Sequence, residues 1–231
     1  MIQLSELEMA NSFEKALKSS VIRCIPHFDI VYRELKCQQG IPDFIGIPSD
    51  KFVTTFNFST LSSIESSSVI LSFLKYHSGR RKDYLKKKTA LSDNLLNKSI
   101  RELQNNKFIV EANGLYYISP QMELFNDNIW AFELKLSNWK RALFQALQNK
   151  TFSNFSIVVF PFGKEHVLMQ NLDVFAKLNV GVLLFEASSF KTKWLYRAKK
   201  EQPVSKWATW FLLGKVSSQK SQEISLLSFH E

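Results

Sequence analysis

The stretch Trp130–Leu136 alternates large apolar residues with Glu133 and Lys135. A period of two is typical of a β-strand, so the two charged residues share one face, about 7 Å apart along the chain. Apolar residues then recur at helical spacing through residues 138–149, which predicts a helix. A carboxylate beside an amine, on a strand that leads into a helix, is an unusual placement next to a core. It is a first indication of metal-assisted chemistry.

The first fifty residues predict a helix followed by extended segments. Residues 5–18 have amphipathic helical spacing, and Ser5 with Glu8 three positions later forms a capping box. The β-branched and aromatic content predicts strands, which are expected at 21–25, 28–35 and, after a turn at 38–40, at 41–47.

Asp43 stands out in the last of these strands, because alternation puts it on one face with Ile41, Ile45 and Ile47. A carboxylate buried among apolar side chains is costly without a partner. The position therefore predicts a metal ion or a lysine beside Asp43.

Residues 60–120 predict a separate module of three helices and a β-hairpin, at 66–77, 83–89, 93–105, 108–111 and 115–118. Asn113-Gly114 between the last two segments is a strong hairpin signal. This order resembles a winged helix-turn-helix, whose core positions are matched by Leu85, Leu96, Ile100, Leu103 and Ile109. The resemblance implies that 93–105 is a recognition helix and 108–118 a wing.

The remainder alternates strands with helices, which predicts at least one parallel strand pair. Buried strands are expected at 155–160 and 180–185, with helices at 167–178 and 205–215.

The chain of 231 residues carries a net charge of +9, and the excess lies in two segments. Residues 61–120 hold ten Lys or Arg against five Asp or Glu, and residues 191–231 hold eight against three. Such a distribution suits a polyanionic partner. A solvated basic surface without a partner is the alternative.

No apolar run reaches the ~18–20 residues that cross a bilayer, and the N-terminus lacks a signal-peptide pattern, so no membrane partner is expected. Cys24 and Cys37 lack metal-ligand spacing. They favour a cytoplasmic location over a disulfide scaffold, with one bridge between them as an alternative.

The chemistry-bearing residues follow one another on predicted elements in the order Glu14, Asp43, Glu133, Lys135, Gln145. This order resembles the PD-(D/E)XK nuclease superfamily, whose motif is matched by Pro42-Asp43 and Glu133-Leu134-Lys135. The resemblance covers about residues 5–50 and 127–186. It implies an α/β restriction-endonuclease-like αβββαβ core with a mixed central sheet, interrupted by the winged-helix module. The expected boundaries are 1–58 and 122–231 for the core and 59–121 for the insertion.

The resemblance also implies a Mg²⁺ site, with Mn²⁺ as an alternative ion, whose ligands are Asp43, Glu133 and the main-chain carbonyl of Leu134. The metal would polarise a phosphate and lower the pKa of bound water. Lys135 would orient that water or stabilise the developing charge. Glu14 would add a further carboxylate, and Gln145 would position Lys135 or the phosphate.

Each candidate residue also has a plainer interpretation. Glu133 and Lys135 can form an ion pair of little energetic value, and Asp43 can be tied to backbone amides. Glu14 can be a solvated helix residue, with Glu6 and Glu8 as rival candidates, and Gln145 can be a surface residue.

The leading hypothesis is a Mg²⁺-dependent DNA endonuclease that grips its substrate with the inserted module. The expected DNA contacts are Lys86, Lys87, Lys88, Asn94, Asn97, Lys98 and Arg101. A homodimer, formed by the aromatic C-terminal helix, or a larger nucleoprotein assembly stays open. The alternative function is a DNA-binding regulator or assembly subunit that kept the fold without turnover. A third hypothesis makes the winged helix a protein-docking module.

Overall fold

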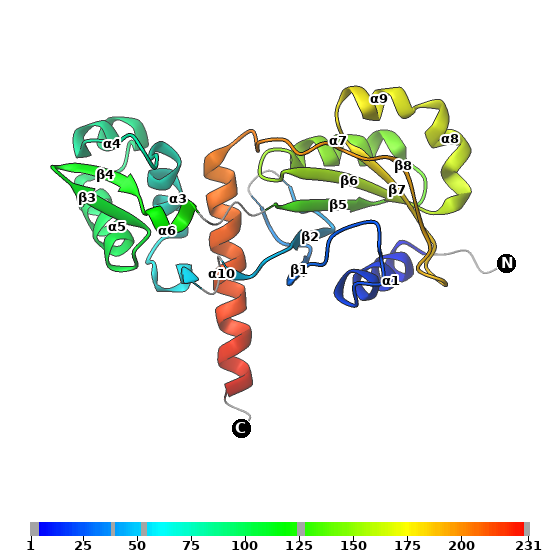
Figure 1. Cartoon of the computed structure of the whole chain (residues 1–231), viewed down its shortest axis with the longest axis horizontal. Coiled ribbons are helices and arrows are strands. Elements are labelled where there is room, and N and C mark those ends of the chain that lie inside the picture. The colour runs from blue at the N-terminus through cyan, green and yellow to red at the C-terminus, as the bar shows by residue number, and fades with distance from the viewer. Residues whose placement is uncertain (1–4, 38–39, 52–54, 124–127, 229–231) are drawn as a thin grey trace. The chain divides into compact units, whose positions relative to one another are not determined.

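The computed structural model describes residues 5–37, 40–51, 55–123 and 128–228. The chain forms two compact units (Figure 1). The first unit comprises residues 1–49 and 127–204, and the second comprises residues 50–126 and 205–231.

The first unit is built on a mixed six-stranded sheet, which confirms the predicted α/β class. The strands are β1 (Ile30–Arg33), β2 (Phe44–Ile47), β5 (Trp130–Leu134), β6 (Phe155–Phe160), β7 (Gly181–Phe185) and β8 (Thr192–Tyr196). They lie in the order β1-β2-β5-β6-β7-β8. β5, β6 and β7 run parallel, whereas β1–β2, β2–β5 and β7–β8 pair antiparallel.

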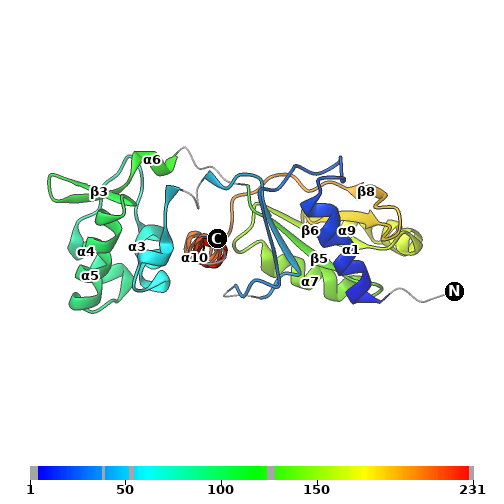
Figure 2. The same ribbon diagram turned by 90° about the horizontal axis from the view of Figure 1, so that it is seen from below.

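Helices cover both faces of this sheet (Figures 1 and 2). Helix α1 (Glu6–Lys18) packs on one face, and α7 (Trp139–Asn149), α8 (Glu165–Gln170) and α9 (Leu172–Lys177) pack on the other. The alternation along β6 shows why both faces are apolar. Ile157 and Val159 join the core under α1, whereas Val158 and Phe160 join the core under α7.

Local signals set the ends of these helices. Ser5 and Glu8 form the predicted capping box of α1. The Asn138 side chain accepts a hydrogen bond from the Arg141 backbone N–H and so caps the start of α7. The helix that follows β5 therefore begins at a defined point.

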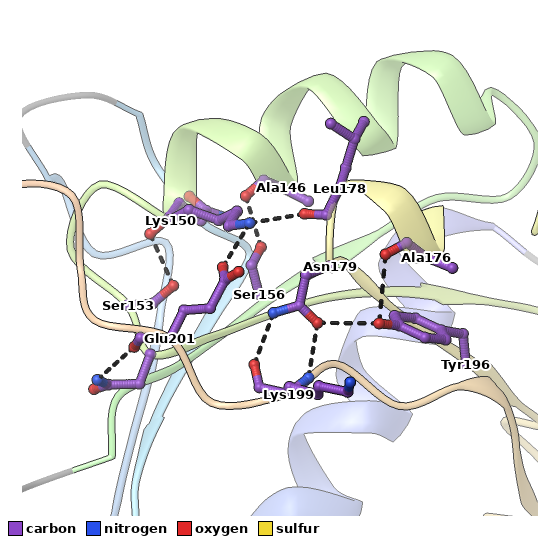
Figure 3. A network of polar contacts seen from close by, with 12 residues as sticks. Ala146, Lys150, Ser153, Ser156, Ala176, Leu178, Asn179, Tyr196, Lys199 and Glu201 are labelled. Atoms are coloured by element: carbon purple, nitrogen blue, oxygen red, sulfur yellow. Dashed lines mark hydrogen bonds and ion pairs between the residues drawn. The ribbon is translucent and has the colours of Figure 1, made fainter. Parts of the chain in front are cut away.

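An irregular segment closes the first unit and is fastened to it by polar contacts (Figure 3). The Lys150 ammonium donates to the Leu178 carbonyl and pairs with Glu201, both at 2.7 Å. The Asn179 side chain donates to the Lys199 carbonyl and accepts from the Lys199 N–H and the Tyr196 hydroxyl. These contacts hold residues 199–201 against the helices on the α7 side.

The second unit contains the predicted three helices and hairpin. They are α3 (Ile64–Phe73), α4 (Lys82–Thr89), α5 (Asp93–Asn105), β3 (Ile109–Ala112) and β4 (Leu115–Ile118). The five predicted core residues are all buried. Asn113 and Gly114 both have positive φ, which the predicted hairpin turn requires. Arg80 adds a bridge to Tyr116 at the edge of the hairpin.

The long helix α10 (Lys206–Ser228) belongs to this second unit, where it lies beside α3 (Figure 2). A Cβ on Gly214 would lie 2.5 Å from Ile64 and 2.9 Å from Phe58, so the two elements approach closely there. The Ser217 hydroxyl donates to the Phe56 carbonyl and accepts from the Phe58 N–H. The boundary expected from the sequence instead assigned residues 205–231 to the core formed by residues 1–58 and 122–231. The short 3-10 turn η1 (Phe58–Thr60) precedes α3, and the short helix α6 (Pro120–Glu123) follows the hairpin.

Several predicted elements differ in extent or kind. Residues 21–25 form turns rather than a strand, and the strand expected at 41–47 begins only at Phe44. The helix expected at 167–178 is split into α8 and α9, and β8 was not predicted. The turn expected at 38–40 falls mostly on Gln38 and Gln39, outside the described residues.

Cys24 and Cys37 are free thiols. Among the described residues, no helix has the length and apolar character needed to span a membrane.

Candidate metal centre

Two carboxylates lie on neighbouring strands at one end of the first unit's sheet. Glu133 belongs to β5, and Asp43 comes immediately before β2, rather than within it as predicted. β2 and β5 pair with Phe44 opposite Phe132, and both rings lie in the core under α1. Alternation therefore directs Asp43 and Glu133 to the opposite face, which α7 covers.

Lys135 follows β5 directly and brings its ammonium to these carboxylates. Its Nζ donates to the Leu134 carbonyl at 2.8 Å and lies 3.5 Å from Asp43 Oδ2 and 3.9 Å from Glu133 Oε2. The Lys135 side chain is only 13% exposed, so the contacts are not those of a surface ion pair. The lysine predicted as a partner for Asp43 is therefore Lys135.

The backbone holds Asp43 as well. The Leu134 N–H donates to Asp43 Oδ2 at 2.7 Å, which adds one bond beyond the Phe44–Phe132 pairing. The tie to a backbone amide, the plainer interpretation of Asp43, thus exists together with the lysine contact. It fixes the orientation of one carboxylate and leaves Oδ1 without a described hydrogen bond.

Glu133 is the most deeply buried group of the cluster, with a side chain 2% exposed. Burial, and after it the nearby Asp43 charge, raise the pKa of its carboxyl from 4.5 to about 7. A hydrogen bond from Asn149 and the Lys135 charge act in the opposite direction. Glu133 Oε2 is buried and accepts no hydrogen bond from a described residue.

Asn149 is the site residue that the sequence did not reveal. Its Nδ2 donates to Glu133 Oε1 at 2.9 Å, and the residue is 1% exposed. Asn149 lies one helical turn after Gln145 on the same face of α7. The prediction of Gln145 as a site residue was therefore the one sequence feature that could have pointed to Asn149. Gln145 Oε1 is itself buried without a described hydrogen-bond partner.

Glu14 lies apart from this cluster in its contacts. It belongs to α1, which packs on the other face of the sheet. Its carboxylate pairs with Lys18 at 2.7 Å and with Arg33 at 3.7 Å. The structure therefore brings Asp43, Glu133 and Lys135 together and gives Glu14 cationic partners of its own.

The predicted DNA contacts all lie in the second unit, on α4 and α5. Six of the seven are exposed, namely Lys86, Lys87, Lys88, Asn94, Lys98 and Arg101, and Asn97 is half-buried. Lys86 pairs with Asp93 at 2.7 Å in a solvent-exposed position. Arg101 Nε approaches the Asn97 carbonyl at 3.4 Å. These side chains are accessible to a partner of the second unit.

The donor set is small but suited to a hard cation. Among the described residues, no three His, Cys, Asp or Glu side chains form a group that could hold a metal ion. The candidate ligands are instead two carboxylates and the Leu134 carbonyl, all of them oxygen donors of the kind Mg²⁺ prefers. The three groups already meet at one cation, the Lys135 ammonium, and the buried Glu133 Oε2 accepts no hydrogen bond from the part of the chain that the structure describes. The residues therefore fit a divalent cation.

Comparison of the chain with family models, with curated proteins and with solved structures gives no match.

Proposed function

We propose that the chain is a Mg²⁺-dependent DNA endonuclease on a restriction-endonuclease-like core. The observation that carries the proposal is the meeting of Asp43, Glu133 and the Leu134 carbonyl at Lys135. The element order supports it, because α1, β1, β2, β5, α7 and β6 follow one another as αβββαβ around a mixed sheet. The elements before Asp43 (α1 and β1) and after Glu133 (α7 and β6) are those expected from the resemblance to PD-(D/E)XK nucleases.

The chain's own residues would divide the work of phosphodiester hydrolysis. Asp43, Glu133 and the Leu134 carbonyl would hold Mg²⁺, which supplies charge neutralisation at the phosphate and acidifies water. The Lys135 ammonium is the cation closest to both carboxylates and would stabilise negative charge that develops on the phosphate.

Two residues of α7 would support this centre. Asn149 fixes Glu133 through Oε1 and thereby leaves Oε2 directed at the cation. The buried Gln145 Oε1, which has no described partner, would hold Lys135 or a water beside it. Glu14, with its contacts to Lys18 and Arg33, would act on the site through Arg33, which pairs with Phe44 beside Asp43.

The second unit would bind DNA as a winged helix. Its helices α3, α4 and α5 and the β3–β4 hairpin follow in the order of that module, with α5 as the recognition helix. Lys98 and Arg101 are exposed on α5, and Lys86–Lys88 end the preceding helix. Lysine and arginine in these places would contact phosphates and release counterions.

The test is cleavage of a substrate panel of supercoiled plasmid, linear duplex, single-stranded DNA and RNA with Mg²⁺. Wild type is expected to nick or cut at least one DNA substrate. Asp43→Ala and Lys135→Ala are expected to lose at least about a hundredfold in rate, a loss typical of removing a charged catalytic contact. Lys140→Ala, which removes an exposed lysine over Trp139, serves as the control. If wild type leaves the whole panel intact, or both variants cut as fast as wild type, the catalytic proposal fails.

One observation favours the alternative, a DNA-binding protein that kept the fold without turnover. Asp43 is already satisfied by the Leu134 N–H and Lys135, so the cluster is held together by its own residues. Calorimetry with Mg²⁺ separates the two functions, because a nuclease binds the ion and its Asp43→Asn variant binds it more weakly. A non-catalytic protein shows no Mg²⁺ binding in either form and still binds DNA.

A further inference from the structure

The Lys135 ammonium lies where the three candidate metal ligands meet. Its hydrogen bond to the Leu134 carbonyl is 2.8 Å long, and the two carboxylate oxygens lie 3.5 and 3.9 Å away. The ammonium therefore donates a hydrogen bond to the carbonyl and pairs electrostatically with both carboxylates. Lys135 and Glu133 are largely buried and Asp43 is 30% exposed, and among the described residues this amine is the cation that pairs with both carboxylates.

We propose that Lys135 is the built-in occupant of the cation position, which a divalent ion enters only by displacing Nζ from the Leu134 carbonyl. The inference rests on the proposed metal-dependent function. It adds that Lys135 Nζ occupies the cation position when no metal is bound. An oxygen that accepts a hydrogen bond from an ammonium is engaged, and a dication beside that ammonium would be repelled at short range. Lysine has a flexible four-carbon stem, so Nζ can leave without moving the backbone of β5.

The exchange has a functional consequence. In the absence of metal the chain folds with one positive charge beside its two carboxylates, and metal entry frees that amine beside the same oxygens. The released ammonium then lies within reach of whatever anion the metal recruits. Binding of the ion and placement of Lys135 would thus be one event rather than two.

The experiment is calorimetric titration with Mn²⁺ of the wild-type chain, Lys135→Met and Lys140→Met. Methionine keeps the length of the apolar stem but removes the competing ammonium. We expect Lys135→Met to bind Mn²⁺ about tenfold more tightly than wild type, equivalent to about 1.4 kcal/mol. Lys140→Met, on the exposed surface of α7, should bind as wild type does.

The outcomes separate this inference from the function on which it rests. If wild type binds Mn²⁺ and Lys135→Met binds it no more tightly, the exchange is refuted and the metal site stands. If no variant binds Mn²⁺, the metal centre itself is refuted and the exchange with it.

A crystal of the wild-type chain soaked in Mn²⁺ gives a second check that does not depend on the variant's folding. The exchange predicts Mn²⁺ density at the Leu134 carbonyl, with Nζ no longer bonded to that oxygen. Mn²⁺ bound to Asp43 or Glu133 while Nζ still donates to Leu134 would overturn it.

Discussion

The buried carboxyl of Glu133 is expected to make the first unit less stable as the pH rises. Burial and the Asp43 charge raise its pKa from 4.5 to about 7 in the folded chain. A group whose folded-state pKa is raised contributes stability that is fully present below the unfolded value and is lost as the pH rises through the folded value. The window is therefore pH 4.5 to about 7. One pKa unit corresponds to about 1.4 kcal/mol, so the contribution lost across that window is about 3 kcal/mol.

The substitution that isolates this effect is Glu133→Gln. Glutamine fills a similar volume and can still accept the Asn149 hydrogen bond, but it has no proton to release near neutral pH. Between pH 5 and pH 8 the wild-type first unit should lose about 2–3 kcal/mol more of its unfolding free energy than the variant does. Glu34→Gln, with a side chain 66% exposed, is the matched control and should keep the wild-type dependence.

The assay is urea unfolding followed by tryptophan fluorescence. Two of the five tryptophans, Trp207 and Trp210, lie on α10 in the second unit. Replacing both by phenylalanine in every protein compared leaves Trp130, Trp139 and Trp194 to report on the first unit alone. If wild type and Glu133→Gln change equally between the two pH values, Glu133 does not titrate as a buried carboxyl and the reasoning is wrong.

Three further predictions concern single contacts. Asn149→Ala should destabilise the first unit by about 1–3 kcal/mol, since a buried Glu133 oxygen loses its hydrogen-bond donor. Urea unfolding should show a larger loss of stability at pH 8 than at pH 5. An equal loss at the two pH values would contradict the role of Asn149 as donor to the Glu133 carboxylate. Gly214→Val should destabilise the second unit by about 1–3 kcal/mol through overpacking against α3, and an unchanged midpoint of α10 fluorescence would argue against the close approach. The pair Lys98→Glu and Arg101→Glu should weaken DNA binding and flatten its dependence on log salt by about 2; an unchanged slope in a fluorescence-anisotropy titration would favour the protein-docking hypothesis.

The second unit was the part of the fold that local signals predicted best. Helix 93–105 has the predicted bounds, because Ser92 caps its start and a regular apolar stripe continues to its end. Asn113 and Gly114 set the hairpin by their own backbone preferences. Neither feature depends on a distant part of the chain.

The errors in the first unit arise from tertiary contacts. Residues 21–25 are rich in β-branched side chains, but Ile22 packs into the core under α1 and the Ile25 N–H bonds back to it in a turn. β8 contains Lys193 and is followed by Arg197, in a segment with the composition of a basic tail, yet the strand pairs with β7. Core packing decided the first segment and strand pairing the second, and composition alone identifies neither.

The strand residues of the candidate site were predicted from the sequence, whereas Asn149 on α7 was missed. Alternation places Glu133 and Lys135 on one face, and the cost of burying Asp43 predicts a partner, which the structure identifies as Lys135. Asn149 carries no such signal, because an asparagine at the end of a helix is ordinary in a sequence. Its contact with Glu133 exists only once α7 has packed over β5.

Asp43 and Glu133 are proposed to form a centre for metal-dependent hydrolysis of DNA. The most direct measurement is the single-turnover rate of DNA cleavage, with and without Mg²⁺, by wild type and Asp43→Asn. Asparagine can still accept the Leu134 N–H through its amide oxygen, so the variant removes the charge and keeps the local bond. Wild type is expected to cleave DNA only with Mg²⁺, and the variant at a rate at least about a hundredfold lower. Equal rates in the two proteins, or cleavage that proceeds equally without the ion, would contradict it.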